Sequence, residues 1–144
     1  MTIFSKDKVN LDAKAVDKYE AIRLVGQMLV DAGHVPTEYI DKMIERENDL
    51  STYMGGGLAI PHGTNDSKRL IRSTGLAVAI FSEGVDFGEE KAYLLVGIAA
   101  VGSGHLELLT NIAVLCSEEE NIKRIINASS KEELISILEG GVVA

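Results

Sequence analysis

Two nearly continuous apolar runs limit what this chain of 144 residues folds into. They cover residues 76–81 and 94–101, and both are rich in branched side chains. Successive side chains of a strand point to opposite faces of its sheet, so a strand without polar positions is buried on both faces. Helices are the usual cover for such a sheet, and the two runs therefore predict an α/β fold.

Helical spacing of apolar residues predicts the covering helices. One helix is expected between Asp17 and Gly33, with Asp17 and Glu20 placed for a capping box and Gly33 placed to stop it. A weaker pattern predicts a second helix from Thr37 to about Asn48. Further helices are expected from His105 to Cys116, around residues 122–126, and after Ser130 with Gly140 and Gly141 as the stop. The prediction is a single domain over residues 1–144, with a small mixed β-sheet flanked by helices on both sides.

A short strand that ends at a loop is predicted near the middle of the chain. Three glycines at 55–57 precede the apolar residues 58–60, and Pro61-His62-Gly63 follows. A strand end between a proline and a glycine presents an imidazole better than it buries one. His62 is therefore a candidate functional residue, and a loop histidine without a role is the alternative. Residues 83–88 are interpreted as a turn with a short strand.

His105 is the second candidate because it opens a predicted helix directly after Gly102-Ser103-Gly104. The first turn of a helix has unpaired N–H groups and the positive end of the helix dipole, and both favour an oxyanion. If the loops of His62 and His105 meet at the ends of neighbouring strands, one ring acts as nucleophile. The other ring then donates a hydrogen bond to the oxygens of a phosphoryl group that the first ring attacks. The alternative for His105 is an ordinary first-turn residue.

The remaining histidine and the single cysteine receive structural interpretations. His34 follows the predicted helix stop and is expected at the surface, and Cys116 is expected in the core as an unreactive packing residue. Histidine, aspartate and glutamate show no close ligand spacing, and nucleotide-binding and serine-hydrolase motifs are missing from the sequence. We therefore expect neither a metal ion nor a cofactor.

Charge and hydropathy restrict the partners and the compartment. The formal net charge of −8 repels phosphate backbones, so nucleic acid is not an expected partner. The run at 94–101 is far shorter than the roughly 20 residues that cross a bilayer, and the first residues lack the apolar stretch of a signal peptide. One cysteine forms no internal disulfide. These features predict a cytoplasmic protein without membrane insertion.

Several segments together resemble the enzyme IIA domain of the mannitol/fructose class of the bacterial phosphoenolpyruvate-dependent sugar phosphotransferase system. The mannitol branch resembles this chain most. The segments are Met43-Ile-Glu-Arg-Glu47, Thr52-Tyr-Met-Gly-Gly-Gly-Leu-Ala-Ile-Pro-His-Gly-Thr64, Gly84-Val-Asp-Phe-Gly88 and Leu95-Val-Gly-Ile-Ala-Ala100, followed by His105. The resemblance extends over essentially the whole chain.

The resemblance implies a phosphoryl carrier. In that family the histidine of the Pro-His-Gly segment accepts phosphate from the carrier HPr and passes it to a IIB domain, which implies that His62 forms a tele-phosphohistidine. It further implies a mannitol-type IIB partner that works with a membrane IIC component. Direct sugar binding is not expected, because the chain lacks tryptophan and only 5% of its residues are aromatic. His105 is implied as a hydrogen-bond donor to the phosphoryl group and Arg46 as a stabilising charge, unless Arg46 is only a surface helix residue. Relatives often carry an acidic residue where this chain has glycines 55–57, so no carboxylate role is transferred.

Two other classes of function stay open at this point. On the same scaffold, phosphorylation of His62 would control binding to other proteins, as in nitrogen-type regulatory relatives. The Thr52-Tyr53 segment and Phe87-Gly88 are mannitol-like and argue against that alternative. A metal-dependent hydrolase has neither motif nor ligand spacing in its favour.

Overall fold

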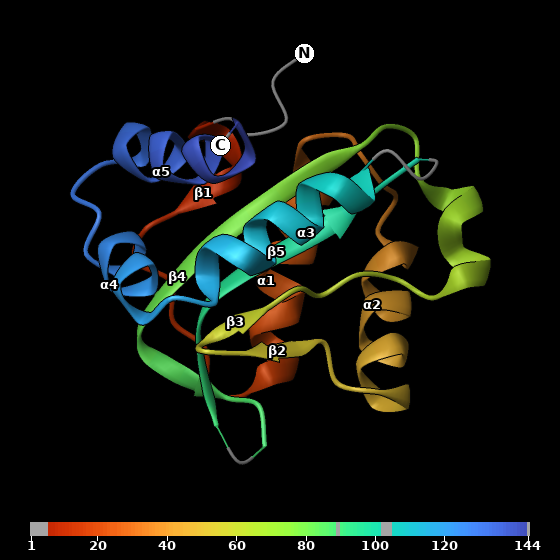
Figure 1. Ribbon diagram of the computed structural model, residues 1–144. Coiled ribbons are helices and arrows are strands. Elements are labelled where there is room, and N and C mark those ends of the chain that lie inside the picture. Colours follow the sequence, from red (N-terminus) through yellow and green to blue (C-terminus); the bar gives the residue numbers. More distant parts are fainter. Residues whose placement is uncertain (1–5, 89, 102–104, 144) are drawn as a thin grey trace.

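The computed structural model describes the backbone of residues 6–88, 90–101 and 105–143 and the side chains of residues 6–88, 90–101 and 110–138. A five-stranded mixed sheet lies between two layers of helices (Figure 1), which confirms the predicted α/β class. In chain order the elements are the 3-10 helix η1 (Lys6–Lys8), β1 (Val9–Asn10), α1 (Lys18–Asp31), α2 (Glu38–Asp49), β2 (Tyr53–Gly55), β3 (Leu58–Ala59), the 3-10 helix η2 (Asn65–Leu70), β4 (Gly75–Asp86), β5 (Lys91–Ala99), α3 (His105–Cys116), α4 (Glu119–Ile126) and α5 (Lys131–Val143).

The strand order is β1-β4-β5-β3-β2. The two long strands β4 and β5 pair antiparallel, with Val78 opposite Val96, and they contain the first apolar run and residues 94–99 of the second. β3 pairs parallel with β5, and β2 forms an antiparallel hairpin with β3. β1 pairs parallel with β4 at the other edge and was not predicted, because a two-residue strand has no periodicity to detect.

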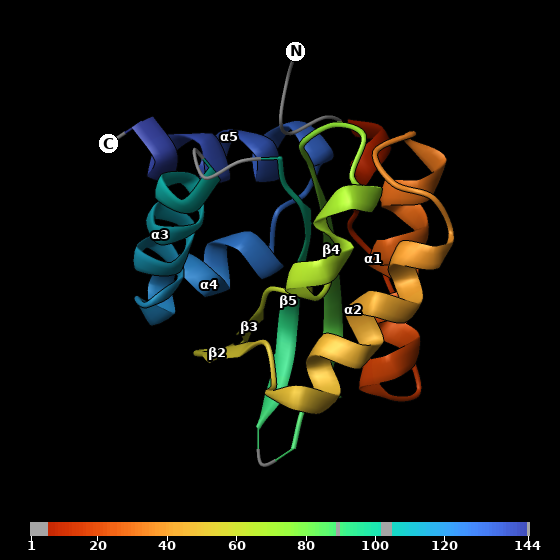
Figure 2. The same ribbon diagram turned by 90° about the vertical axis from the view of Figure 1, so that its right-hand side faces the viewer.

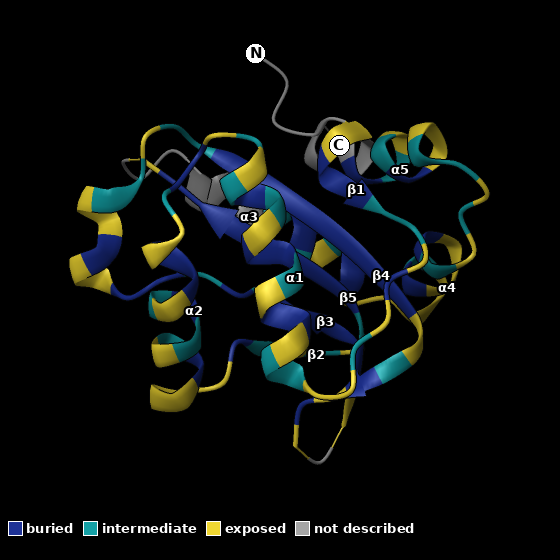
Figure 3. Cartoon of the chain, turned by 180° about the vertical axis from the view of Figure 1, so that it is seen from behind, coloured by how far each residue is buried: buried dark blue, intermediate teal, exposed yellow. Residues whose placement is uncertain are grey.

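Different helices cover the two faces of the sheet (Figure 2), and the two faces also carry different side chains. Towards α3, α4 and α5 the sheet presents large aliphatic residues: Leu76, Val78, Ile80, Leu94, Val96 and Ile98. Towards α1 and α2 it presents mainly small ones: Ala59, Ala77, Ala79 and Ala99. A Cβ on Gly97 would lie 2.9 Å from Cγ2 of Val25, so small residues let α1 approach the strands closely. Figure 3 shows the sheet as a buried layer between the helices, as the unbroken apolar runs predict.

Glycine ends the first helix as predicted. Asp17 is the N-cap of α1, and its side chain accepts a hydrogen bond from the backbone N of Glu20 at 2.9 Å. Gly33 has φ of +82°, the left-handed conformation that terminates many helices. The tight hairpin between β2 and β3 also uses this freedom, because Gly55, Gly56 and Gly57 all have positive φ.

Two glycine-containing segments differ from the prediction to different extents. The short strand predicted within residues 83–88 is present as residues 83–86 of β4, where Gly84, at φ +80°, accommodates an irregularity in the strand pairing between Ile80 and Val85 instead of a turn. The helix stop predicted at Gly140 and Gly141 was wrong, because α5 runs through both to Val143. Glycine permits the left-handed conformation of a helix stop but does not impose it, and inside a helix it costs only about 1 kcal/mol relative to alanine.

Candidate functional site

His62 lies at the carboxyl end of a strand, as predicted. Beyond β3 the chain continues beside β5, where the backbone N of Ile98 donates to the carbonyl of Pro61 at 2.9 Å. His62 forms a parallel bridge with Ile98 and is half-buried. The pairing thus holds the backbone of His62 against a buried central strand.

The imidazole of His62 has a defined orientation. Its Nδ1 lies 2.8 Å from the carbonyl oxygen of Ile60. A carbonyl only accepts hydrogen bonds, so Nδ1 carries the proton and donates it to Ile60. In the neutral ring the lone pair then belongs to Nε2, the atom that attacks an electrophile such as phosphorus.

A buried carboxylate, that of Glu47, anchors the chain segment that leads to β2, β3 and His62. The side chain of Glu47, in α2, accepts hydrogen bonds from the backbone N of Thr52 at 2.8 Å and from its Oγ1 at 2.6 Å. Burial alone would raise the pKa of Glu47, but hydrogen bonds from Ser51 and Thr52 and the charge of Lys18 together hold that pKa below its usual value. The carbonyl of Thr52 in turn accepts from the N of Ile60 at 3.0 Å. Glu47 therefore ties the end of α2 to the segment that carries His62.

Arg46 lies on the same helix, next to Glu47, and is half-buried. Its Nη1 donates a hydrogen bond to the carbonyl of Leu50, beyond the last turn of α2. A cation is favoured there because the carbonyl end of a helix is electronegative. Within the described side chains, the hydrogen bonds of Arg46 do not include one to His62.

The backbone of His105 opens α3, as the sequence predicts, while its side chain lies outside the described residues. β3 and β5 are neighbours and parallel, so their carboxyl ends lie at one edge of the sheet. His62 follows β3, and α3 is the next helix after β5. The topology therefore satisfies the condition that the two histidines follow neighbouring strands.

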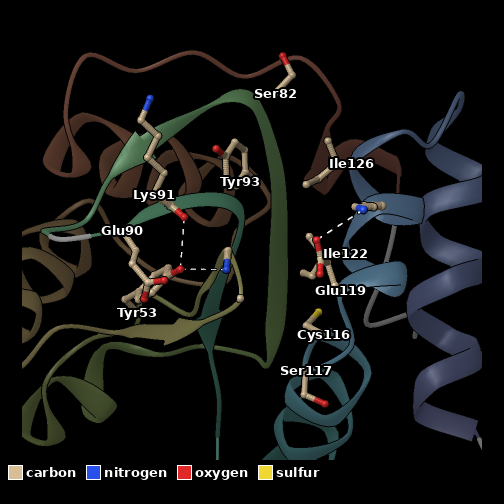
Figure 4. Close-up of a pocket in the computed structure, with 13 residues that line it drawn as sticks. Tyr53, Ser82, Glu90, Lys91, Tyr93, Cys116, Ser117, Glu119, Ile122 and Ile126 are labelled. Carbon is tan, nitrogen blue, oxygen red and sulfur yellow. Dashed lines mark hydrogen bonds and ion pairs between the residues drawn. The ribbon is translucent and has the colours of Figure 1, made fainter.

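One cavity of the described structure lies elsewhere. It has a volume of about 630 Å³ and lies between the start of β5 and the α3–α4 corner, with Tyr53, Tyr93, Ile122 and Ile126 among its lining residues (Figure 4). Tyr93 precedes Ile98 by five residues, which is roughly 16 Å along a strand. The cavity therefore lies away from His62 itself, although the β2–β3 hairpin that precedes His62 contributes Tyr53, Gly56 and Gly57 to its lining.

The described part of the chain contains no group of three or more histidine, cysteine, aspartate or glutamate side chains placed to hold a metal ion. In the same part, every helix is too short or too polar to cross a bilayer.

Comparison with known proteins identifies the family. The family model described as "Phosphoenolpyruvate-dependent sugar phosphotransferase system, EIIA 2" matches residues 2–140. The chain belongs to this EIIA family. The mannitol-specific phosphotransferase enzyme IIA component of Geobacillus stearothermophilus is 48% identical over 139 residues, which cover 96% of each chain. The corresponding component of Bacillus subtilis is 46% identical over 138 residues, covering 95% of this chain and 96% of the relative.

Solved structures agree with this assignment. The complex of enzyme IIAMTL with phosphorylated enzyme IIBMTL from Escherichia coli contains a chain that matches with a TM-score of 0.88 and 36% identity, covering 95% of this chain and 97% of that one. The crystal structure of IIA mannitol from the same organism gives a TM-score of 0.86, also at 36% identity, with coverages of 94% and 98%. The resemblance inferred from the sequence motifs is confirmed, and this EIIA chain is a phosphotransferase component.

The prediction for His34 was wrong, because this residue of the EIIA chain is buried and only 6% exposed. Its Nε2 lies 2.9 Å from Nζ of Lys8, and its Nδ1 lies 2.8 Å from Oγ of Ser73. Burial and the neighbouring Lys8 charge lower the pKa of His34, against the opposing effects of Ser73 and Asp7. The helix stop at Gly33 was predicted correctly, but the stop did not show that the start of β4 would pack against His34.

Cys116 is buried, as predicted. Burial raises the pKa of its thiol to about 12, so almost none of it is thiolate at neutral pH. Sequence reasoning missed two side chains of the EIIA fold that hold the His62 segment, Glu47 and Tyr39. Glu47 belongs to a motif that was noted, but its role depends on a contact with Thr52 that spacing alone does not reveal.

Proposed function

We propose that this EIIA chain is a phosphoryl carrier that accepts a phosphoryl group from phospho-HPr on Nε2 of His62 and passes it to a mannitol-type IIB domain. The observation that carries the proposal is the hydrogen bond from Nδ1 of His62 to the Ile60 carbonyl, because it assigns the lone pair to Nε2. The names of the relatives support the mannitol branch, and one solved relative is titled as a complex with phosphorylated IIB. Residues 1–144 act in this proposal as one EIIA domain in the cytoplasm.

The transfer step is an in-line displacement at phosphorus. The lone pair of Nε2 forms the new N–P bond while the bond from phosphorus to the donor breaks, and the donor leaves with that electron pair. The ring becomes an imidazolium. Its Nδ1–H still donates to the Ile60 carbonyl, and the carbonyl dipole stabilises the positive charge of the ring. Reversal of the same geometry delivers the group to the IIB nucleophile, and the step uses no cofactor.

Charge stabilisation of the transferred group is assigned to two further residues. The topology supports His105, because α3 begins beyond the carboxyl end of the strand that pairs with His62. Its ring would donate a hydrogen bond to a phosphoryl oxygen, helped by the first N–H groups of α3. Arg46 is assigned the milder role of a nearby positive charge. To contact the phosphoryl group directly, its guanidinium would have to exchange or share the hydrogen bond to the Leu50 carbonyl.

Specificity is assigned to docking with protein partners. The aromatic content is 5% and tryptophan is missing from the sequence, so composition gives no sign of a sugar-stacking platform. HPr and IIB must use the surface around His62 in turn, which favours small, transient contacts that depend on shape and on rim charge.

The deciding experiment is incubation with enzyme I, HPr and phosphoenolpyruvate, followed by mapping of acid-labile phosphate. We expect one tele-phosphohistidine at His62, followed by faster transfer to a mannitol-type IIB domain than to a fructose-type one. Calorimetry with millimolar mannitol should show no binding. Stable binding of a regulatory protein with no transfer to either IIB would favour the nitrogen-type alternative, and failure to accept phosphate would refute the carrier.

A further inference from the structure

The hydroxyl of Tyr39 connects the residue after His62 with Ile98, the residue of β5 that pairs with His62. Tyr39 lies in the first turn of α2, and only 2% of it is exposed. Its oxygen accepts a hydrogen bond from the backbone N of Gly63 at 2.9 Å and donates one to the carbonyl of Ile98 at 3.1 Å. Burial raises the pKa of Tyr39, so the hydroxyl keeps the proton that it donates.

These two bonds complete the pairing on the far side of His62. Before His62, the N of Ile98 donates directly to the carbonyl of Pro61. In a parallel ladder with this register, the next bond would run from the N of Gly63 to the carbonyl of Ile98. The Tyr39 hydroxyl bridges this donor and this acceptor, so both backbone groups of Ile98 hold the residues next to His62.

The fit around Gly63 shows that the bridge is closely packed. A Cβ at this position would lie 2.6 Å from Cε1 of Tyr39 and 2.4 Å from Oγ of Ser67. Ser67 in turn donates from Oγ to the carbonyl of Thr64 at 2.6 Å. The ring of Tyr39 and the first turn of η2 therefore leave space for glycine alone directly after His62.

We propose that Tyr39 is a positioning residue for phosphoryl transfer, holding the backbone after His62 so that Nδ1 stays on the Ile60 carbonyl and Nε2 faces the phosphorus. This inference rests on the proposed function of His62. Reacting atoms must be aligned closely, and a displacement of about 1 Å costs up to about 100-fold in rate. Loss of the Tyr39 hydroxyl leaves the Gly63 N–H and the Ile98 carbonyl without their bridge. The imidazole ring of His62 is then free to change its tautomer.

The test compares Tyr39→Phe with Tyr19→Phe. Tyr19 is a matched control because its hydroxyl donates to Oδ1 of Asn48 at 2.7 Å, between α1 and α2 and outside the site. For Tyr39→Phe we expect kcat for phosphate acceptance to fall about 10- to 100-fold with little change in the KM for phospho-HPr. The ¹⁵N shifts of the neutral His62 ring should show a larger Nε2–H fraction. Tyr19→Phe should keep kcat and the Nε2–H fraction of His62 at wild-type values.

Either a wild-type kcat in Tyr39→Phe or an unchanged tautomer ratio would overturn the inference. Gly63→Ala is a second variant that keeps the hydroxyl but places a Cβ against the ring, and it should lower kcat in the same way. The tautomer measurement needs no phosphate. A wild-type protein that accepts no phosphate would therefore refute the proposed function while the positioning of the ring is still measured.

Discussion

His62 and His34 are two imidazoles of one chain in opposite surroundings. His62 is half-buried at a strand end and donates from Nδ1 to a backbone carbonyl. His34 is buried, with Lys8 on one ring nitrogen and Ser73 on the other, and its ring lies against Gly75. The first arrangement orients a ring at the carboxyl end of a strand, whereas the second uses both ring nitrogens in hydrogen bonds with the buried Lys8 and the half-buried Ser73.

The difference teaches that backbone placement, more than residue type, separates the histidine proposed to react from a structural one. The sequence places both residues next to a glycine, after a predicted element end. β4 then covers His34 and leaves Lys8, itself only 4% exposed, as its partner. An ammonium group has only donors, so Nε2 of His34 accepts from Lys8 and the ring proton lies on Nδ1. His34 therefore contributes to stability through its neutral form.

The largest effect is expected from removal of the His62 ring, the proposed phosphoryl acceptor. His62→Ala should abolish phosphate acceptance from HPr while the fold stays intact, because a half-buried strand-end imidazole contributes chemistry more than packing. His34→Ala is the matched control, with lower stability but retained acceptance. Phosphorylation assays beside thermal unfolding curves test both variants, and full phosphorylation of His62→Ala would remove the distinction.

His105→Ala should slow transfer without eliminating it. The variant loses one charge-assisted donor worth about 1.5–3 kcal/mol, which corresponds to roughly 10- to 150-fold in rate. Rapid-quench measurement of acceptance and of transfer to IIB checks both directions. Unchanged rates in both directions would make His105 an ordinary first-turn residue and leave His62 without this partner.

Gly75→Ala should destabilise the protein and spare the chemistry. A Cβ there would lie 2.3 Å from both Cδ2 and Nε2 of His34, and such overpacking costs about 1–3 kcal/mol. Urea unfolding of this variant should show the loss, and the same substitution in a His34→Ala background should show less of it. Equal costs in the two backgrounds would mean that the buried ring does not set the packing limit.

The smallest effect is the pH dependence that His34 adds. Its pKa is lowered in the folded state, so below about pH 6.5 the unfolded chain binds the proton more readily than the folded protein does. Stability due to His34 is therefore fully present above that pH and declines as the pH falls towards the folded-state pKa. Urea unfolding at pH 7.5 and 5.5 should show a smaller decline for His34→Gln than for the wild type, and identical declines would contradict the assignment.

Local patterns in the sequence determined the elements that depend on neighbouring residues. The apolar runs predicted β4 and β5, Asp17 and Gly33 delimited α1, and the Pro61-His62-Gly63 segment predicted a strand end. These features were predictable because side-chain periodicity, capping and glycine conformation act over a few residues. The same segments carried the family resemblance, which predicted a phosphate-accepting role for His62.

The tertiary structure alone decided which distant groups meet. Tyr39 reaches Gly63 and Ile98, and Lys8 reaches His34, across separations that no local pattern encodes. The predictions that failed, a surface His34 and a helix stop at Gly140, concerned residues whose surroundings or conformation neighbouring residues do not dictate. Burial, hydrogen-bond partners and pKa depend on what packs against a side chain, and that is settled only when the strand order β1-β4-β5-β3-β2 brings the segments together.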